Sequence, residues 1–334
     1  MNSKLLKVKG KETINKFIAS LFFVIIFVYY LNYPSESSKG YLLIRGTEGV
    51  LRLEYGFWGY LNDISYKFLD FISGELITGN FLMELIFAFQ ISLIYAVNVY
   101  KINKITNFYT VFILLNPFVL NFFCRGTRDA IALGILLLLS YENWNKLRLL
   151  LTIITSFCIH KGILPLTFLF SLIHRNKEKS KTYFFALTII SILFAIIFHT
   201  LLRYTDFADL IPNGFYKEIL KFPRLAYTDE ATLLSKIENL IIGKTYNFYG
   251  SFNLKILFFG IIGQIASISF KDKLPNNTFP LCFSSFFICS ILSSVPNADR
   301  FIYHSTIISS PFLLDYFSKF LKDLYKRKFQ VSSN

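Results

Sequence analysis

The apolar residues of this chain fall in blocks of roughly bilayer-spanning length, separated by short charged stretches. Hydrophobic residues make up 54% of the 334 positions, and charged residues make up 17%. Soluble domains usually carry about a quarter charged residues. The pattern therefore predicts an all-α integral membrane protein that forms a single polytopic domain over residues 1–334.

The blocks predict about ten transmembrane helices. One continuous apolar run, residues 147–174, is interrupted at His160, Lys161 and Gly162, and basic residues flank it on both sides. Two short spans that meet in a bent hairpin explain this arrangement better than one crossing does. The expected spans are 14–33, 79–100, 107–124, 129–142, 147–160, 162–174, 182–202, 249–269, 278–296 and 301–317.

The basic residues predict the orientation. Six segments on one side of the expected spans total 61 residues and hold 20 of the 35 Lys and Arg. Short cytoplasmic loops of membrane proteins are enriched in Lys and Arg, so we expect both termini in the cytoplasm. The net charge of +14 follows from the same loops, and no nucleic-acid partner is expected.

Two long segments, 34–78 and 203–248, then face outward. In the first, Phe57, Leu61, Ile64 and Phe68 recur at helical spacing, which predicts an amphipathic helix at the membrane interface. The second carries a similar apolar stripe. Structured outward loops of this kind favour a site on the outer face.

Arginine residues lie where positive-inside statistics disfavour them. Arg125 and Arg128 immediately precede the 129–142 span, and Arg300 precedes the last span. If a helix begins near Thr127, its positive end adds to the guanidinium charges, and together they favour an anion such as phosphate. The alternative is that Arg125 simply pairs with Asp129 four residues later.

His160 is the first candidate for proton transfer, since it lies at the bend between the two short spans and an imidazole exchanges a proton near neutral pH. A hydrogen-bonded packing histidine is the alternative. Glu54 is a second candidate base, although a solvated glutamate at a helix start is common. The chain contains no Walker loop, Rossmann fingerprint or zinc-protease motif, so we expect no cofactor and no metal.

Four motifs, in order, resemble the EpsG family of Wzy-like polysaccharide polymerases. The first two are Glu54-x-Gly56-Phe57 and Arg128 followed by Asp-Ala-Ile-Ala-Leu-Gly. The third is Phe157-Cys-Ile-His160, and the fourth is the pair Asp299-Arg300 before the last span. The resemblance covers roughly residues 50–320. Asp129 stands where the family usually has Gln, and Lys161-Gly162 replaces small polar residues.

The resemblance implies a GT-C-like fold in the bacterial plasma (inner) membrane. It implies a glycosyltransferase that joins undecaprenyl-pyrophosphate-linked repeat units of a capsule, exopolysaccharide or O-antigen on the outer face, with a chain-length regulator as a possible partner. Arg125, Arg128 and Arg300 would bind pyrophosphate, while His160 or Glu54 would act as the base. Trp58 and Tyr60 would contact sugars.

Two other functions stay open. A membrane acyltransferase that modifies a surface polysaccharide would also use a histidine, but it would need an acyl-donor site. A flippase or transporter for lipid-linked oligosaccharides would also have many spans. Matching halves are common in transporters, and the sequence shows no such symmetry.

Overall fold

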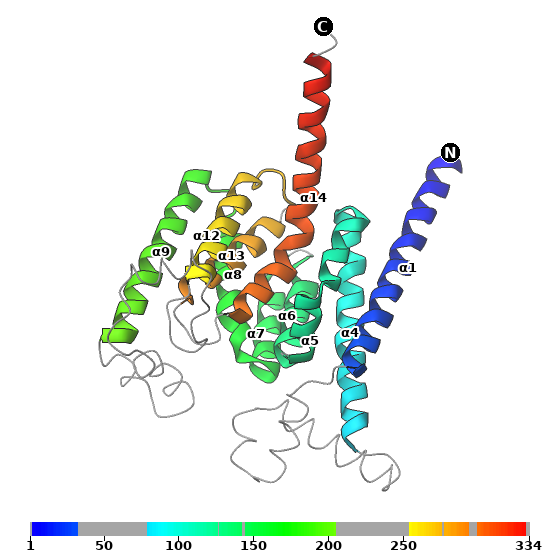
Figure 1. Ribbon diagram of the computed structural model, residues 1–334, viewed down its shortest axis with the longest axis horizontal. Coiled ribbons are helices and arrows are strands. Elements are labelled where there is room, and N and C mark those ends of the chain that lie inside the picture. The colour runs from blue at the N-terminus through cyan, green and yellow to red at the C-terminus, as the bar shows by residue number, and fades with distance from the viewer. Residues whose placement is uncertain are drawn as a thin grey trace, which may run out of the picture. The chain divides into compact units, whose positions relative to one another are not determined.

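The computed structural model describes residues 2–32, 79–125, 127–141, 144–204, 254–275, 277–293 and 299–331. Every regular element in these ranges is a helix (Figure 1), which confirms the all-α prediction. The outward segment 34–78 and residues 205–248 of the second one lie outside the described part of the chain. The amphipathic helices expected there stay predictions.

Three of the described helices are long and apolar enough to cross a membrane, over Gly10–Asn32, Glu84–Ile105 and Lys181–Leu201. Three others are apolar but shorter, namely Leu164–Arg175, Leu254–Ser269 and Thr278–Ile291. The described part of the chain therefore contains three candidate membrane-spanning helices. The total of about ten crossings stays a prediction.

The chain divides into two compact units, which are described separately. Unit 1 comprises Met1–Ser171 and Ser310–Asn334, and unit 2 comprises Leu172–Ser309. The prediction of a single domain is not tested by this division.

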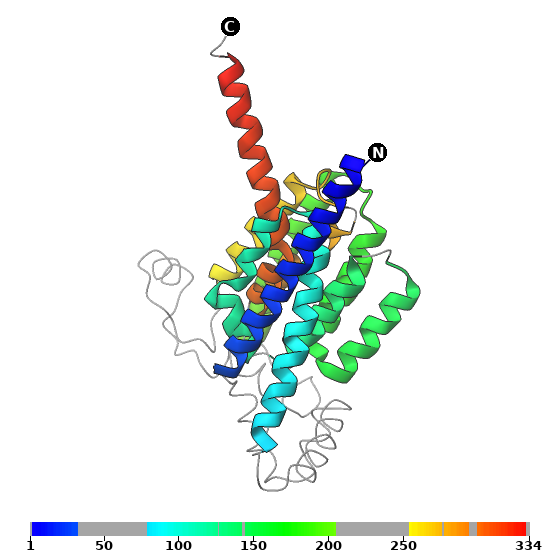
Figure 2. The same cartoon turned by 90° about the vertical axis from the view of Figure 1, so that its right-hand side faces the viewer.

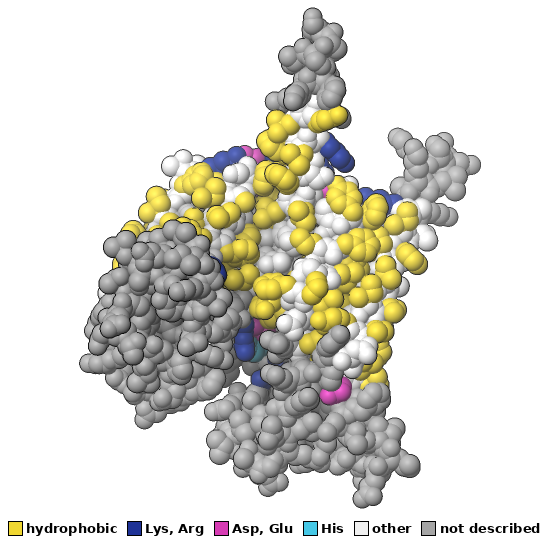
Figure 3. Space-filling view, in the orientation of Figure 1, with side chains coloured by type: hydrophobic (Ala, Val, Ile, Leu, Met, Phe, Trp, Pro, Cys, Tyr) yellow, Lys and Arg dark blue, Asp and Glu magenta, His cyan; other side chains and the backbone are white. Residues whose placement is uncertain are grey.

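Unit 1 is built on a pair of long helices, α1 (Asn2–Asn32) and α4 (Gly79–Ile105), which pack side by side in both views (Figures 1 and 2). Residues four apart on a helix share one face, and the buried face of α1 follows this spacing with Ile18, Phe22, Ile26 and Tyr30. The outer sides of the pair remain apolar, as the yellow surface of Figure 3 shows. Such a surface suits contact with lipid.

The short elements of unit 1 follow in sequence. They are η3 (Phe108–Leu115), α5 (Pro117–Arg125), α6 (Thr127–Ser140), α7 (Lys146–Ile159), η4 (Lys161–Ile163) and the first part of α8 (Leu164–Arg175). The last part of α14 (Asp299–Val331) also belongs to unit 1. In Figures 1 and 2 the first residues of α1 and the last residues of α14 lie at the same end of this unit.

The apolar block 107–124, which we expected to form one span, is divided into η3 and α5. Asn116 has an extended backbone with φ −66° and ψ 149°, because the residue before a proline is disfavoured in the helical region. Pro117 then occupies the first helical position, where its missing N–H costs nothing. The side chain of Asn116 accepts a hydrogen bond from the Val119 N–H at 3.0 Å and so caps α5.

The two short helices predicted within residues 147–174 are confirmed. Helix α7 has 14 residues and α8 has 12, so each is about 20 Å long at 1.5 Å per residue. This is less than the roughly 30 Å of a hydrocarbon core. The break falls at His160, as expected, and the turn η4 fills it.

Unit 2 contains α9 (Lys181–Tyr204), α12 (Leu254–Ser269) and α13 (Thr278–Ile291), which pack against one another (Figure 1). A buried amide joins all three helices. Gln264 of α12 donates to the Ser290 hydroxyl of α13 at 2.8 Å and to the Ser191 hydroxyl of α9 at 3.2 Å. In an apolar surrounding such a polar contact fixes which faces of the helices meet.

Glycines allow α12 and α13 to approach closely. A Cβ at Gly260 would lie 2.8 Å from both the Phe286 carbonyl oxygen and the Ser290 backbone nitrogen, and a Cβ at Gly263 would overlap the Phe286 ring. Backbone atoms cannot move aside as a side chain can. The helix pair therefore depends on these two positions having no side chain.

We predict that Gly260→Ala destabilises the protein by about 1–3 kcal/mol, because an added methyl group must push two helix backbones apart. The measurement is the thermal unfolding midpoint of the purified protein in detergent. Ile262→Val on the exposed side of the same helix is the control and should leave the midpoint nearly unchanged. An unchanged midpoint for Gly260→Ala would contradict the close backbone contact.

Candidate functional site

The site is built around the first turn of α6. Helix α5 ends at Arg125 and α6 begins at Thr127, as expected from the sequence. The Tyr30 hydroxyl of α1 lies 2.9 Å from the buried Thr127 hydroxyl. The Tyr95 hydroxyl of α4 donates to the Ala130 carbonyl at 3.0 Å. Two buried tyrosines from two long helices thus hold the start of α6 in place.

Further along α6, close packing on α4 continues this support. Asn98 donates to the Gly134 carbonyl at 3.0 Å. A Cβ at Gly134 would overlap the Ile94 side chain, so only glycine lets the two helices come this near. The position of α6 is therefore fixed over its first two turns.

Asp129 is the third residue of α6, and its side chain is 2% exposed. A carboxylate in an apolar interior is costly unless other groups stabilise its charge. The positive end of a helix is one such group, and Asp129 lies within the first turn of α6. A second is an imidazole from another element.

That imidazole belongs to His160. Its Nδ1 lies 3.3 Å from Oδ1 of Asp129, across 31 positions of sequence. The His160 side chain is 26% exposed, so its ring meets the buried carboxylate and still reaches the surface of unit 1. A carboxylate beside Nδ1 can orient the ring and leave Nε2 facing a substrate.

The local backbone explains why the ring can take this position. His160 ends α7 with an extended conformation, φ −155° and ψ 110°, so its side chain leaves the helical path. A Cβ at Gly162 would lie 2.7 Å from Cε1 and 2.9 Å from Nδ1 of the ring. Glycine two residues after the histidine therefore provides the space that the imidazole occupies.

The structure brings only some of the predicted site residues together. Arg128 is half-buried and lies between Thr127 and Asp129 in the first turn of α6. Arg125 is the last residue of α5, one turn earlier, and only its backbone is described. Arg300 is exposed at the second position of α14 and belongs to unit 2.

Three predicted site residues lie outside the described part of the chain. They are Glu54, the second candidate base, and the expected sugar-contacting residues Trp58 and Tyr60. Their roles stay predictions. Among the described residues, no three side chains of His, Cys, Asp or Glu gather in a way that would hold a metal ion.

Sequence reasoning missed Asp129 as a site residue and treated it only as a possible partner of Arg125. The available signal was an acidic residue at the start of an apolar helix, where burial makes a charge costly. A contact that the structure does show, with His160, joins residues distant in sequence. Only the fold brings His160 next to Asp129.

In comparisons with known proteins, no family model, no curated protein and no solved structure matches this chain. The resemblance to the EpsG family therefore rests on the four sequence motifs. The chemistry of the site has to be argued from its own residues.

We predict that Asp129 and His160 are energetically coupled. The single variants Asp129→Asn and His160→Ala should each destabilise the protein, and the double variant should deviate from additivity by about 0.5–3 kcal/mol, as directly interacting residues do. The measurement is unfolding in mixed micelles for all four proteins. Asn145→Ala, at the other end of α7, is the control partner for Asp129→Asn and should be additive. Strict additivity of the first pair would show that the two side chains do not interact.

Proposed function

We propose that this protein is a membrane-embedded glycosyltransferase that joins lipid-linked oligosaccharide repeat units into a polysaccharide, as a Wzy-like polymerase similar to the EpsG family. The observation that carries the proposal is the pair formed by the buried Asp129 and the partly exposed His160 at the start of α6. A polymerase needs a base for a sugar hydroxyl and cations for a departing pyrophosphate. Both kinds of residue occur at this helix start.

In the proposed reaction an acceptor sugar hydroxyl of one repeat unit attacks the anomeric carbon of the growing glycan. Nε2 of His160 accepts the hydroxyl proton, and the Asp129 carboxylate stabilises the resulting imidazolium. The new glycosidic C–O bond forms as the bond from the anomeric carbon to the pyrophosphate oxygen breaks. The leaving group is undecaprenyl pyrophosphate, to which the proton can return.

Charge develops on the pyrophosphate as it leaves. The first turn of α6 presents backbone N–H groups and the positive end of the helix, and Arg128 adds a guanidinium there. Arg125, the last residue of α5, has the same proposed role. The pyrophosphate role of Arg300, which belongs to unit 2, stays a prediction from the sequence. No cofactor enters this scheme, because the exchange of bonds at the anomeric carbon needs only a base for the attacking hydroxyl and cations for the leaving pyrophosphate.

The remaining features of the proposal come from the sequence. About ten crossings in a GT-C-like arrangement, an outer-face site and cytoplasmic termini in a bacterial plasma membrane suit a lipid-linked substrate. Glu54 remains the alternative base. Trp58 and Tyr60 would contact sugars, and a chain-length regulator would be a partner.

A carboxylate–imidazole pair also suits transfer of an acyl group to a sugar hydroxyl, so a membrane acyltransferase is the second candidate. A polymerase fits better because acyl transfer does not require arginines at the start of α6. A flippase would need charge along a whole path. The three functions leave different products in the cell.

We predict that deleting the gene in its host collapses the surface polysaccharide ladder to a single repeat unit. The intact gene should restore the ladder, and Arg128→Ala should not, because the pyrophosphate then leaves without the guanidinium at the first turn of α6. Ladders are sized on a gel, with the variant present in the membrane at wild-type amount. Arg175→Ala, an exposed arginine at the end of α8, is the control and should restore the ladder fully.

Other outcomes distinguish the alternatives. A ladder of normal length with altered mobility would indicate a modifying acyltransferase. Loss of all surface material, with lipid-linked units retained inside the cell, would indicate a flippase. Full activity of the Arg128→Ala protein would refute the pyrophosphate role of this residue.

We also predict that Gly162→Ala reduces polymer formation by roughly tenfold or more, because small displacements of a catalytic group are costly. The added methyl group would occupy the space of the His160 ring. Polymer yield is measured in the complemented deletion strain. Gly10→Ala is the matched control, since a Cβ there meets nothing within 4 Å. Equal yields from the two variants would contradict His160 as the base.

A further inference from the structure

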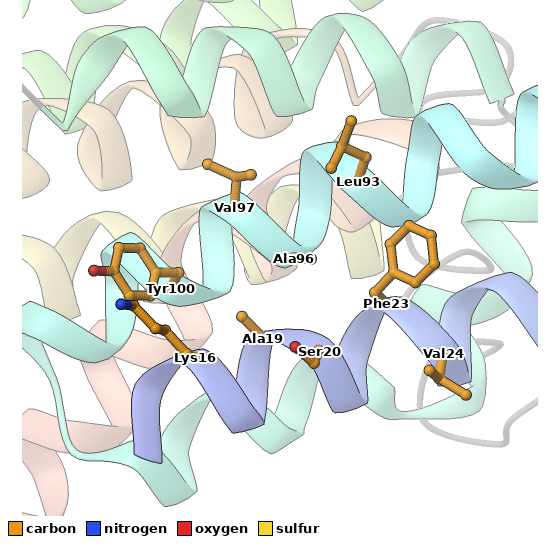
Figure 4. Close-up of a pocket in the computed structure, with 9 residues that line it drawn as sticks. All are labelled: Lys16, Ala19, Ser20, Phe23, Val24, Leu93, Ala96, Val97 and Tyr100. Carbon is orange, nitrogen blue, oxygen red and sulfur yellow. The ribbon is translucent and has the colours of Figure 1, made fainter. Parts of the chain in front are cut away.

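A groove of about 690 Å³ runs between α1 and α4 in unit 1. Its walls are almost entirely apolar and include Phe23 and Val24 of α1 and Leu93 and Val97 of α4 (Figure 4). The small residues Ala19, Ser20 and Ala96 make room between the helices. The groove is open to the surface, and both helices that form it are long and apolar enough to cross a membrane.

One end of the groove is basic. The Lys16 side chain extends toward Tyr100 at this end (Figure 4), and the ammonium group of Lys104 lies 4.4 Å from the centre of the Tyr100 ring. Two ammonium groups and a phenol hydroxyl thus gather where the apolar walls end.

A carboxylate is also present at this end. Glu12 lies 3.1 Å from the Lys16 ammonium, and both side chains are more than half exposed. Exposed ion pairs four residues apart on a helix contribute little stability. A phosphate group can therefore share or displace Glu12 without much cost, and Lys104 keeps the end net positive.

We infer that this groove binds an acidic phospholipid of the surrounding membrane. Its acyl chain lies between α1 and α4, and its phosphate meets Lys16 and Lys104 beside the Tyr100 hydroxyl. Basic residues next to membrane-spanning helices attract anionic lipid headgroups. The apolar walls of the groove suit contact with a hydrocarbon chain. A neutral lipid would satisfy the walls but not the two ammonium groups, and the carboxylate Glu12 is too weakly held to replace a phosphodiester.

The proposal does not depend on the proposed enzymatic function. The groove lies on α1 and α4, and none of its lining residues belongs to the Asp129–His160 pair. Loss of lipid binding and loss of polymer formation are therefore separate results.

The test uses the purified full-length protein in detergent at fixed ionic strength, titrated with phosphatidylglycerol or with phosphatidylcholine of the same acyl chains. Native mass spectrometry counts the bound lipids, and the thermal unfolding midpoint reports stabilisation. We expect phosphatidylglycerol to bind and raise the midpoint more than phosphatidylcholine does. The double variant Lys16→Gln, Lys104→Gln should weaken phosphatidylglycerol binding about tenfold or more, given the contribution of each basic residue near an anionic lipid.

Two further variants distinguish the contribution of the basic residues to lipid binding from that of the shape of the groove. Ser20→Leu fills the groove without changing its charge and should also weaken phosphatidylglycerol binding. Lys179→Gln removes an exposed charge away from the groove and should bind like the wild type. Equal effects of the two lipids, or wild-type binding by the charge and filling variants, would overturn the proposal. The proposal would also be overturned if the wild-type protein were a dimer and Ser20→Leu made it a monomer, since the groove would then hold a second copy of the chain.

Discussion

The Asp129 carboxylate is almost completely buried in unit 1, and an apolar interior tolerates a charge only where other groups stabilise it. Three features stabilise this charge: the positive end of α6, the His160 imidazole, and the fixed position of the helix start. The last depends on the Tyr30 and Tyr95 hydroxyls, and so on the packing of α1 and α4. The contacts of Tyr30 and Tyr95 therefore support the position of Asp129.

The break between α7 and α8 has the same origin. A helix that continued through His160 would keep the imidazole on the helical surface, whereas the extended backbone at this residue turns it toward Asp129. Interrupted backbone in an apolar surrounding is tolerated where protein or a cavity lines it. Here the turn η4 restores a hydrogen bond, from the Ile163 N–H to the His160 carbonyl at 3.4 Å. Gly162 leaves room for the ring.

Much of this arrangement was predictable from the sequence. The apolar blocks marked the helices, and the polar interruption at His160 marked the bend. The start of α6 at Thr127, next to Arg128, fulfils the condition on which the anion-site hypothesis depended. The division of block 107–124 was not predicted from its apolar length, although Asn116 before Pro117 indicates it, because a residue before proline disfavours the helical conformation. The Asp129–His160 contact was not predictable, because it joins residues 31 positions apart through the packing of α6 on the α7–η4 junction. The roles of Glu54, Trp58 and Tyr60 stay predictions.

Helix α1 connects the lipid groove to the candidate site. Lys16 and Tyr30 are 14 residues apart on it, about 21 Å at 1.5 Å per residue. Apolar helices in a bilayer gain little from burying their surfaces against one another, so their association depends on close packing and polar contacts. A lipid held in the groove would add contacts to both α1 and α4. It would thereby restrict the freedom of the same two helices whose tyrosines position α6. The site and the groove are chemically independent, yet both depend on the α1–α4 interface.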